Sequence, residues 1–395
     1  MSGIMNSIYN NTLFALSRHT EALFALQEQA TTGSRINRPS DDPTAAASIL
    51  NLQSENGTLE NYLNSLADTV GTLNISSSVL QQMTSAINQT KTSITQVTSG
   101  TYDDNSRQRT AEAIDNTLEQ LVQLANTKNN GQYLFGGADT SSAPFAVSRS
   151  NGKITSVTYQ GSSENLNINV APGVTSNAFY AGSDLFYSDE RSTPVFSGQT
   201  GAAAGTGTSS VTGDVWLTVA LDGANYKITI DDGATWTPVP SAPDANLQVT
   251  DSRTGKVLYV DTTGINSAGT DLVQVPGTND VFGVLITLRD ILNNTKGLSD
   301  AQLQQLRSAS SGSLDEIQNL LVQKQVSVGS RIGFLSNLQT GLDDIKSNNQ
   351  TQTDQLQQAD IAQVSIDLAR HQALYQMSLS VAGKLLSMSL LDFIQ

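Results

Sequence analysis

The sequence predicts an α+β protein in which long N- and C-terminal helices form a coiled-coil or helical-bundle rod, with a small β segment and an inserted β-rich outer domain. Apolar residues recur at heptad spacing near both ends of the 395-residue chain, a pattern that favours long supercoiled helices. The middle of the chain is rich in Gly, Ser and Thr, and its apolar residues alternate with polar ones as in β-strands. Helical spacing then returns, so the two ends are expected to pair.

The heptad pattern is most regular in the N-terminal half of the chain. Its members are Leu52, Leu59, Leu66, Leu73, Leu80, Ile87 and Ile94. At about 1.5 Å per residue, this stretch is a helix of roughly 65 Å. The expected partner is a C-terminal series with two stripes, made of Leu314, Leu321, Val328, Leu335 and Leu342, and of Ile317, Leu338 and Ile345. Lys324 and Arg331 share the second stripe, where charge either fixes the register or marks a solvated stretch.

Turn signals divide the N-terminal half into three helices. Gly33 is placed to end the first helix in a left-handed conformation. The second helix is expected to break near residues 98–105, and Asn129-Asn130-Gly131 is expected to stop the third. The long helix and its return predict an antiparallel helix pair.

A sharp connection, Arg38-Pro39-Ser40-Asp41-Asp42-Pro43, separates the first two helices. Ser40 or Asp42 is expected to cap the second helix, because both side chains accept hydrogen bonds from free backbone N–H groups. Pro43 suits the first helical turn, and the two aspartates complement the helix dipole.

Alternating apolar residues predict the β structure. A small β segment begins at Gln132, and residues 198–213 are interpreted as a flexible low-complexity linker. A meander with marked turns follows over residues 215–260, and the helical period returns at Val281. The β module is therefore predicted to be an insertion. The predicted parts are terminal assembly helices (1–45 and 350–395), a helical rod with a β-hairpin segment (46–195 and 280–349), and an inserted β-rich variable outer domain (196–279).

Composition limits the functional classes. The chain has 36 acidic and 21 basic residues, and its net charge of −15 opposes binding to nucleic acid or anionic membranes. Cysteine is absent, which excludes disulfides, thiol nucleophiles and cysteine metal sites. We also expect no membrane insertion and no cleaved signal peptide, so any export uses another route.

The terminal helices carry more apolar surface than one partner helix can cover. We interpret this surface as an interface between copies of the protein, with an ordinary core helix as the alternative. The candidate assembly residues are Leu13, Leu16, Leu23, Leu26, Ile361, Val364, Leu368, Leu374, Met377, Val381, Leu385, Met388 and Leu391.

Catalytic chemistry is not indicated. His19 and His371 meet if the terminal helices pair, but no metal-ligand spacing accompanies them. The aspartate pairs at Asp41, Asp103 and Asp231 lie at caps or turns that explain them. We therefore predict no catalytic residues, no cofactor and no metal.

Several segments resemble a known family. The stretch Thr32 to Pro43 is similar to the linker of flagellins and their hook-associated relatives, with Arg35, Pro39, Ser40, Asp41, Asp42 and Pro43 as the motif. Asn130 to Gly137, with Pro144-Phe145, resembles the hook-associated protein 3 family, the hook–filament junction proteins. So do Val328-Gly329-Ser330-Arg331-Ile332 and Ser389-Leu390-Leu391-Asp392-Phe393. The resemblance covers roughly residues 1–190 and 280–395.

This resemblance implies a structural adaptor that joins hook-associated protein 1 to the flagellin filament, with copies of itself in a ring-like layer. It implies export through the flagellar type III system after a transient cytoplasmic stage with an export chaperone, and an extracellular location. It also implies that the terminal helices, about Ile4 to Ala30 and Leu356 to Phe393, are disordered in the monomer and fold on assembly.

Alternatives remain at this stage. A flagellin that polymerises alone would share the helices and the Asp-Asp-Pro linker, but the Tyr-Leu-Phe-Gly-Gly and Leu-Leu-Asp-Phe segments favour the junction family. The β module could bind host surfaces, although Trp216, Tyr226 and Trp236 are its only grouped aromatics and the first two are expected to pack within the sheet. An enzyme is the weakest alternative.

Overall fold

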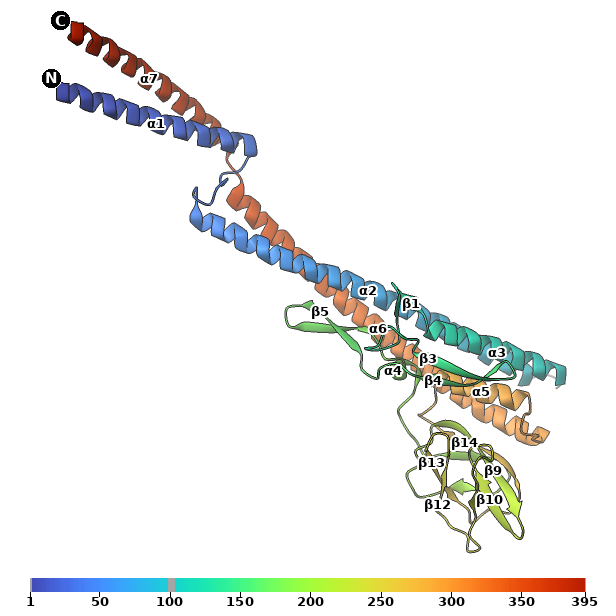
Figure 1. Cartoon of the computed structure of the whole chain (residues 1–395). Helices are drawn as coiled ribbons and strands as arrows, with labels where there is room; N and C mark the ends of the chain where they lie inside the picture. The colour runs from blue at the N-terminus through green and yellow to red at the C-terminus, as the bar shows by residue number, and fades with distance from the viewer. Residues whose placement is uncertain (1, 99–103, 395) are drawn as a thin grey trace. The chain divides into compact units, whose positions relative to one another are not determined.

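The computed structural model describes the backbone of residues 2–98 and 104–394. Side chains are described for residues 7, 10–96 and 105–384. The predicted α+β class is confirmed, with long helices toward both ends of the chain and β structure between them (Figure 1).

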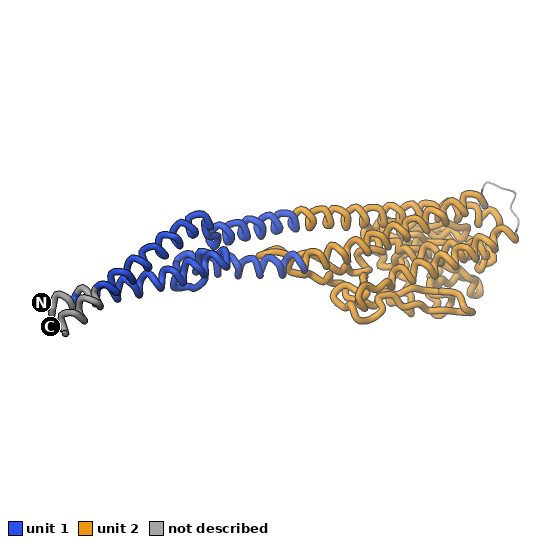
Figure 2. The backbone as a smooth tube through the Cα atoms, turned by 90° about the horizontal axis from the view of Figure 1, so that it is seen from above, with its two compact units in different colours: residues 1–64, 338–395 blue, residues 65–337 orange. Residues whose placement is uncertain are grey.

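The chain divides into two compact units (Figure 2). Unit 1 contains residues 1–64 and 338–395, and unit 2 contains residues 65–337. Two long helices, α2 (Pro43–Thr98) and α6 (Asp300–Gln357), contribute residues to both units.

Unit 1 contains two antiparallel helix pairs. Its first helix, α1 (Ser2–Thr32), lies along the last one, α7 (Ile361–Ile394) (Figure 1). The beginning of α2 lies beside the end of α6, where the Lys346 ammonium is 3.8 Å from a Glu60 carboxylate oxygen. The predicted pairing of the two ends of the chain is thus confirmed within this unit.

The helix ends in unit 1 follow the local sequence signals. Gly33 adopts a φ of 70° directly after α1, and its N–H donates to the Gln29 carbonyl, as predicted for a left-handed cap. Of the two predicted caps of α2, Asp42 is the one used, because its Oδ1 accepts from the Ala45 N–H at 3.0 Å. Pro43 begins the helix as predicted.

Unit 2 has a helical bundle built from α2, α3 (Asp104–Ala125), α5 (Val281–Leu292) and α6. The heptad residues form its core, which confirms the predicted seam. The fully buried members, each at most 1% exposed, are Leu66, Leu73, Leu80, Ile87, Leu314, Ile317, Leu321, Val328 and Leu335. One predicted seam residue is placed differently, because Ile345 of unit 1 is 44% exposed. Lys91 of α2 and Asp315 of α6 form an ion pair at the bundle surface.

The break predicted after α2 falls between Thr98 and Asp104, and residues 99–103 lie outside the described part. The predicted stop of α3 was wrong, since α3 ends at Ala125. Asn130 and Gly131, with φ values of 50° and 82°, instead form the two-residue turn between β1 (Lys128–Asn129) and β2 (Gln132–Tyr133). An Asn-Gly pair adopts positive φ at little cost, which a tight hairpin requires at both positions.

Two further hairpins cover the bundle in unit 2, formed by β3 (Phe145–Ser150) with β4 (Lys153–Tyr159) and by β5 (Leu166–Ala171) with β6 (Val174–Phe179). A short helix, α4 (Gly182–Phe186), follows them. Aromatic rings from these segments and α5 pack edge to face, with ring centroids 5.1–6.2 Å apart. The cluster contains Phe135, Phe145, Tyr159, Phe186 and Phe282.

The remaining strands form the inserted β structure. A five-stranded sheet has the order β11-β10-β9-β14-β7, and a three-stranded sheet has the order β12-β13-β8. The strands are β7 (Val195–Ser197), β8 (Ala203–Ala204), β9 (Gly213–Asp222), β10 (Asn225–Thr229), β11 (Thr237–Pro238), β12 (Leu247–Thr250), β13 (Val257–Asp261) and β14 (Gly269–Val275). The predicted meander is confirmed in β9 and β10, whose inward residues Leu217, Val219 and Ile228 are buried. Helix returns at Val281, as predicted.

The interpretation of residues 198–213 as a flexible linker was wrong. The tract contributes β8 and buries Ala202 and Val211 in the core of the β structure. The Asp271 carboxylate accepts from the Gln199 and Thr200 N–H groups at 2.9 and 3.2 Å. The glycines that suggested flexibility are needed for close approach, because a Cβ on Gly198 would overlap the Asp271 side chain.

Candidate assembly surface

The connection between α1 and α2 is hydrogen-bonded to the connection between α6 and α7, and both lie in unit 1. The Arg35 N–H donates to the Gln357 carbonyl at 2.6 Å, and the Ala359 N–H donates to the Gly33 carbonyl at 2.9 Å. Ser34 and Gln358 form an antiparallel bridge between these bonds. The predicted linker therefore includes a small two-stranded contact. This contact holds the α1–α2 connection against the α6–α7 connection.

Side chains of the predicted linker motif reinforce this contact. One Arg35 guanidinium nitrogen lies 3.3 Å from Asp42 Oδ2, and the other donates to the Leu356 carbonyl at 3.3 Å. The Ala45 N–H bond, followed by the Arg35 bond, lowers the pKa of Asp42 below its usual range. Asp42 thus caps α2 and also binds the arginine that contacts the end of α6.

The other motif residues form a turn. Asp41 Oδ2 accepts from the N–H groups of Asn37 and Arg38 at 3.0 and 2.8 Å, and the Asp41 N–H donates to the Arg38 carbonyl. Pro39 is the second residue of this turn, the position that its fixed φ suits. Pro39 and Ser40 are exposed.

The helix pair α1 and α7 brings six of the thirteen predicted assembly residues together. Val364 is buried, and five others are half-buried along the pair, namely Leu16, Leu23, Leu26, Leu368 and Leu374. Four predicted residues are exposed: Leu13 (43%), Ile361 (47%), Met377 (65%) and Val381 (48%). Leu385, Met388 and Leu391 lie outside the residues whose side chains are described. The pair therefore covers one apolar stripe and leaves another open.

Several further apolar residues on the same two helices are exposed and were not predicted from the sequence. Phe14 and Phe24 of α1 are 70% and 68% exposed, and Ile366 and Leu379 of α7 are 62% and 45% exposed. These residues lie outside the apolar stripes from which the assembly residues were predicted. A helical wheel that marked every large apolar residue would have found them, since aromatic side chains are seldom left on a solvated helix face.

A shallow groove of about 340 Å³ lies between α1 and α7. It is lined by Asn11, Thr12, Ala15, Leu374, Met377, Ser378 and Val381. The groove exposes apolar side chains that the pair itself does not cover. The groove and the open apolar stripe lie on the same helix pair. We therefore take this pair in unit 1 as the candidate docking surface.

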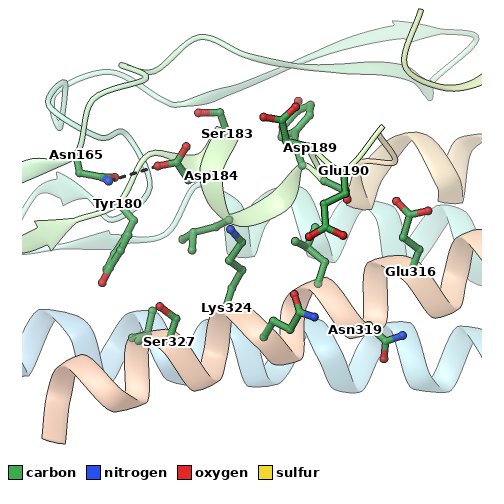
Figure 3. A pocket seen from close by; sticks show the side chains of 16 residues that line it. Asn165, Tyr180, Ser183, Asp184, Asp189, Glu190, Glu316, Asn319, Lys324 and Ser327 are labelled. Atoms are coloured by element: carbon green, nitrogen blue, oxygen red, sulfur yellow. Dashed lines mark hydrogen bonds between the residues drawn. The ribbon is translucent and has the colours of Figure 1, made fainter. Parts of the chain in front are cut away.

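The larger groove, of about 880 Å³, is polar and lies in unit 2 between the α4 segment and α6 (Figure 3). Its charged residues are Asp184, Asp189, Glu190 and Glu316 against the single Lys324, which extends from α6 toward the α4 segment. Glu316 accepts from Asn279 Nδ2 at 2.7 Å, and Asp184 accepts from Asn165 Nδ2 at 3.3 Å. The excess of carboxylates disfavours anionic ligands, and the lining includes no histidine to act as a general base.

The described residues hold no group of three or more His, Asp or Glu side chains that could bind a metal ion. Within that same part of the chain, no helix has a stretch long and apolar enough for a membrane span. His19 and His371 do meet, as predicted for paired terminal helices, with their Nδ1 atoms 3.2 Å apart.

Comparisons with known proteins agree with this arrangement. Residues 5–140 match the family described as the bacterial flagellin N-terminal helical region. Flagellar hook-associated protein 3 of Salmonella typhimurium is 35% identical over 158 residues, which are 39% of this chain and 49% of that protein. The protein of the same name from Escherichia coli is 39% identical over 122 residues, 30% of this chain and 38% of that protein. The chain thus spans about half or less of the length of these relatives.

A solved structure shares the fold. The crystal structure described as the flagellar junction protein FlgL from Legionella pneumophila superposes with a TM-score of 0.51 at 15% identity, over 79% of this chain and 100% of that one. The N-terminal part of the chain is therefore similar to the flagellin N-terminal helical region, and the chain shares the fold of the FlgL structure. The two curated relatives, both named flagellar hook-associated protein 3, are what parts of this chain resemble in sequence.

Proposed function

We propose that this chain is a non-catalytic structural adaptor of the bacterial flagellum, located at the hook–filament junction. It joins hook-associated protein 1 to the flagellin filament, and copies of the chain form a ring-like layer. The observation that carries the proposal is the open apolar surface of α1 and α7, which includes Phe24, Ile366 and Met377. A surface of this kind, on a helix pair whose α1 lies within the region similar to the flagellin N-terminus, is suited to packing against other subunits.

The energetics favour docking through this surface. Burying one large apolar side chain contributes about 1.5–3 kcal/mol, so the exposed residues of α1 and α7 together offset a substantial ordering cost. We propose that these helices become fully ordered on assembly, which links docking to folding. The relatives' names, hook-associated protein 3 and flagellar junction protein, support the junction as the location.

The route to that location is part of the proposal. Export passes through the flagellar type III system, after a transient cytoplasmic stage in which a chaperone covers the apolar C-terminal helix. The β structure of residues 196–279 is a variable outer domain, and junction specificity lies on the helices and linkers.

The experiment that tests the adaptor role is light scattering and electron microscopy of the full chain, alone and with flagellin seeds and hook-associated protein 1. We expect short layers or none from the chain alone and binding to both partners. Binding to neither partner would exclude the adaptor role.

A second candidate is a flagellin that polymerises by itself, which the match of residues 5–140 to the flagellin N-terminal region supports. The same experiment separates the two, since long filaments formed by the chain alone would identify a filament protein.

A further inference from the structure

Helix α6 carries an exposed apolar face in unit 2. Val322 and Val326 are one helical turn apart, and they are 42% and 66% exposed. In the stretch from residue 322 to residue 341, all of which is described, none of the exposed residues is charged. A solvated helix face ordinarily carries charged side chains, so this face is suited to contact with another protein surface.

Two glycines extend the same face. Gly329 and Gly333 follow Val326 at helical spacing, which places all four residues on one side of α6. Both glycines are exposed, and a Cβ at either position would meet no atom of the described chain within 4 Å. Glycine in a helix interior costs about 1 kcal/mol relative to alanine, and no contact within the described chain requires it here. These four residues form the α6 ridge, where the missing side chains allow another backbone to approach closely.

A second uncharged feature lies on α2. A shallow groove of about 290 Å³ runs along this helix and is bordered by Gln120 of α3. Its lining includes Ser78, Gln82, Ser85 and Gln89, and none of its lining residues is charged. The groove extends along α2 from residue 78 to residue 89 and the ridge along α6 from residue 322 to residue 333, about 17 Å in each case. The two features therefore match in length and in their lack of charge.

Valine side chains can enter this groove without burying a charge. Burying an ionised side chain costs far more than burying an uncharged amide that keeps a hydrogen bond. Gln82 Nε2 already lies 3.5 Å from Ser78 Oγ, within the groove. Ser330 and Asn337 are exposed beside the ridge, and their side chains can donate to the amide oxygens of the groove. Such a contact has an apolar centre and a polar rim, as subunit interfaces do.

The ridge and the groove are separate surfaces of unit 2. Leu321 of α6 and Leu80 of α2 are fully buried in the bundle core. With 3.6 residues per turn, Val326 lies about 140° around α6 from Leu321, and Gln82 lies about 160° around α2 from Leu80. Both features thus point away from the core on different helices, so one copy can use both at once.

We propose that the α6 ridge of one copy docks in the α2–α3 groove of a second copy. Because the two surfaces differ, each copy offers its ridge to one neighbour and its groove to another, and a contact of this head-to-tail kind closes into a ring or continues as a helix. The inference rests on the proposed layer of copies and identifies a contact within it. It involves unit 2, so it does not require α1 and α7 to be ordered before docking.

Disulfide cross-linking between copies tests this contact. The chain has no cysteine, so Val326→Cys and Gln82→Cys each introduce one thiol at an exposed position. Chains with one or the other are mixed, assembled on hook-associated protein 1 and oxidised by air with copper phenanthroline, while electron microscopy records the layers. We expect dimers from the mixture and at least ten-fold fewer from either variant alone. In the control, Thr58→Cys, about 36 Å along α2 from Gln82, replaces Gln82→Cys and should give no dimers.

A charge on the ridge gives a second measurement. We expect Val326→Asp to lower the yield of layers at least ten-fold, because a carboxylate would be buried in the groove, while a single copy still binds hook-associated protein 1. Gln304→Asp, at another exposed position of α6, is the matched control and should form layers normally.

The outcomes separate this contact from the adaptor role. Layers that form without dimers between positions 326 and 82 would exclude the contact and leave the adaptor role intact. If Val326→Asp forms layers but no longer binds flagellin, the ridge contacts flagellin and the proposal is wrong. Failure of the native chain to bind hook-associated protein 1 and to form layers would overturn both proposals.

Discussion

Arg35 and Asp42 pair across the connection between α1 and α2, with 3.3 Å between the guanidinium Nη1 and the carboxylate Oδ2. The same arginine binds the Leu356 carbonyl at the start of the neighbouring connection, and Asp42 also caps α2 through the Ala45 N–H. Through this ion pair, the cap of α2 is connected to the contact between the α1–α2 and α6–α7 connections.

Replacing Asp42 separates its two roles. Asp42→Asn keeps a side-chain oxygen for the Ala45 N–H but loses the charge that Arg35 binds, whereas Asp42→Ala loses both. We expect the alanine variant to lower the free energy of unfolding more than the asparagine variant does, since the lost cap matters more than the exposed ion pair. Urea unfolding followed by circular dichroism measures both. Equal losses in the two variants would show that the ion pair, and not the cap, matters.

Charge on the open apolar surface should block docking without unfolding the chain. Phe24→Asp and Met377→Asp each place a carboxylate where the side chain is 68% or 65% exposed. We expect docking to weaken roughly ten- to hundred-fold for each, because the lost burial would contribute about 1.5–3 kcal/mol. Light scattering with flagellin and hook-associated protein 1 measures docking, and calorimetry measures the melting temperature. Gln372→Asp on exposed α7 surface is the matched control. Normal docking by both variants would show that the interface does not include this surface.

The heptad seam predicts that alanine substitutions at two nearby residues of α2 lower the free energy of unfolding by unequal amounts. Leu73 is fully buried and Ile75 is 38% exposed. Leu73→Ala should lower the free energy of unfolding by about 2–5 kcal/mol, through lost burial and the cavity left behind. Ile75→Ala should cost about 1 kcal/mol or less. Denaturant unfolding of the two variants measures both losses. Similar losses would contradict the prediction that Leu73 lies in the buried seam and Ile75 does not.

Asp214 should make the β structure less stable at neutral pH than it would be with a neutral side chain. Burial raises the pKa of Asp214 to about 6, although hydrogen bonds from Gln274 and Thr287 oppose the rise. Because the folded-state pKa is raised, the stabilising contribution is present below about pH 4 and is lost as the pH rises through about 6.

The variant Asp214→Asn removes this titration. We expect its free energy of unfolding at about pH 7 to exceed that of the native chain by about 1–3 kcal/mol, with a smaller difference near pH 4. The fluorescence of Trp216 and Trp236, the two tryptophans of the chain, reports unfolding of the β structure. Asp189→Asn at an exposed position is the control. A gain that is the same at every pH would exclude the titration as its cause.

Removing the inserted strands should leave docking intact but loosen one end of the bundle. The chain enters and leaves them side by side, since the Ser192 N–H donates to the Pro276 carbonyl at 2.8 Å. A short Gly-Ser joint can therefore replace residues 197–275. Leu272 and Trp216, which pack against Ile291 and Leu303, are lost in this variant.

We expect the deletion to lower the melting temperature because it uncovers these α5 and α6 side chains. Docking to flagellin and hook-associated protein 1 should persist. Loss of docking at a temperature where circular dichroism still shows a folded bundle would mean that the β structure contacts a partner.

Elements whose signal is local could be predicted from the amino-acid sequence alone. A strict heptad repeat fixes which face of a long helix is apolar, and Leu66 through Ile87 are buried for that reason. Gly33, Asp42 and Pro43 act through bonds within a few residues, so the first two helices end and begin where predicted. The strands β9 and β10 follow equally local alternation.

Features that depend on partners far apart in the sequence became visible in the folded chain alone. Residues 198–213 are poor in large side chains because Asp271 and Tyr259 approach their backbone, and composition alone cannot distinguish this from flexibility. Phe24 faces solvent because α7 covers a different face of α1, and His19 meets His371 because that pairing sets their separation. Side-chain neighbours far apart in sequence follow from packing geometry, which no local pattern encodes.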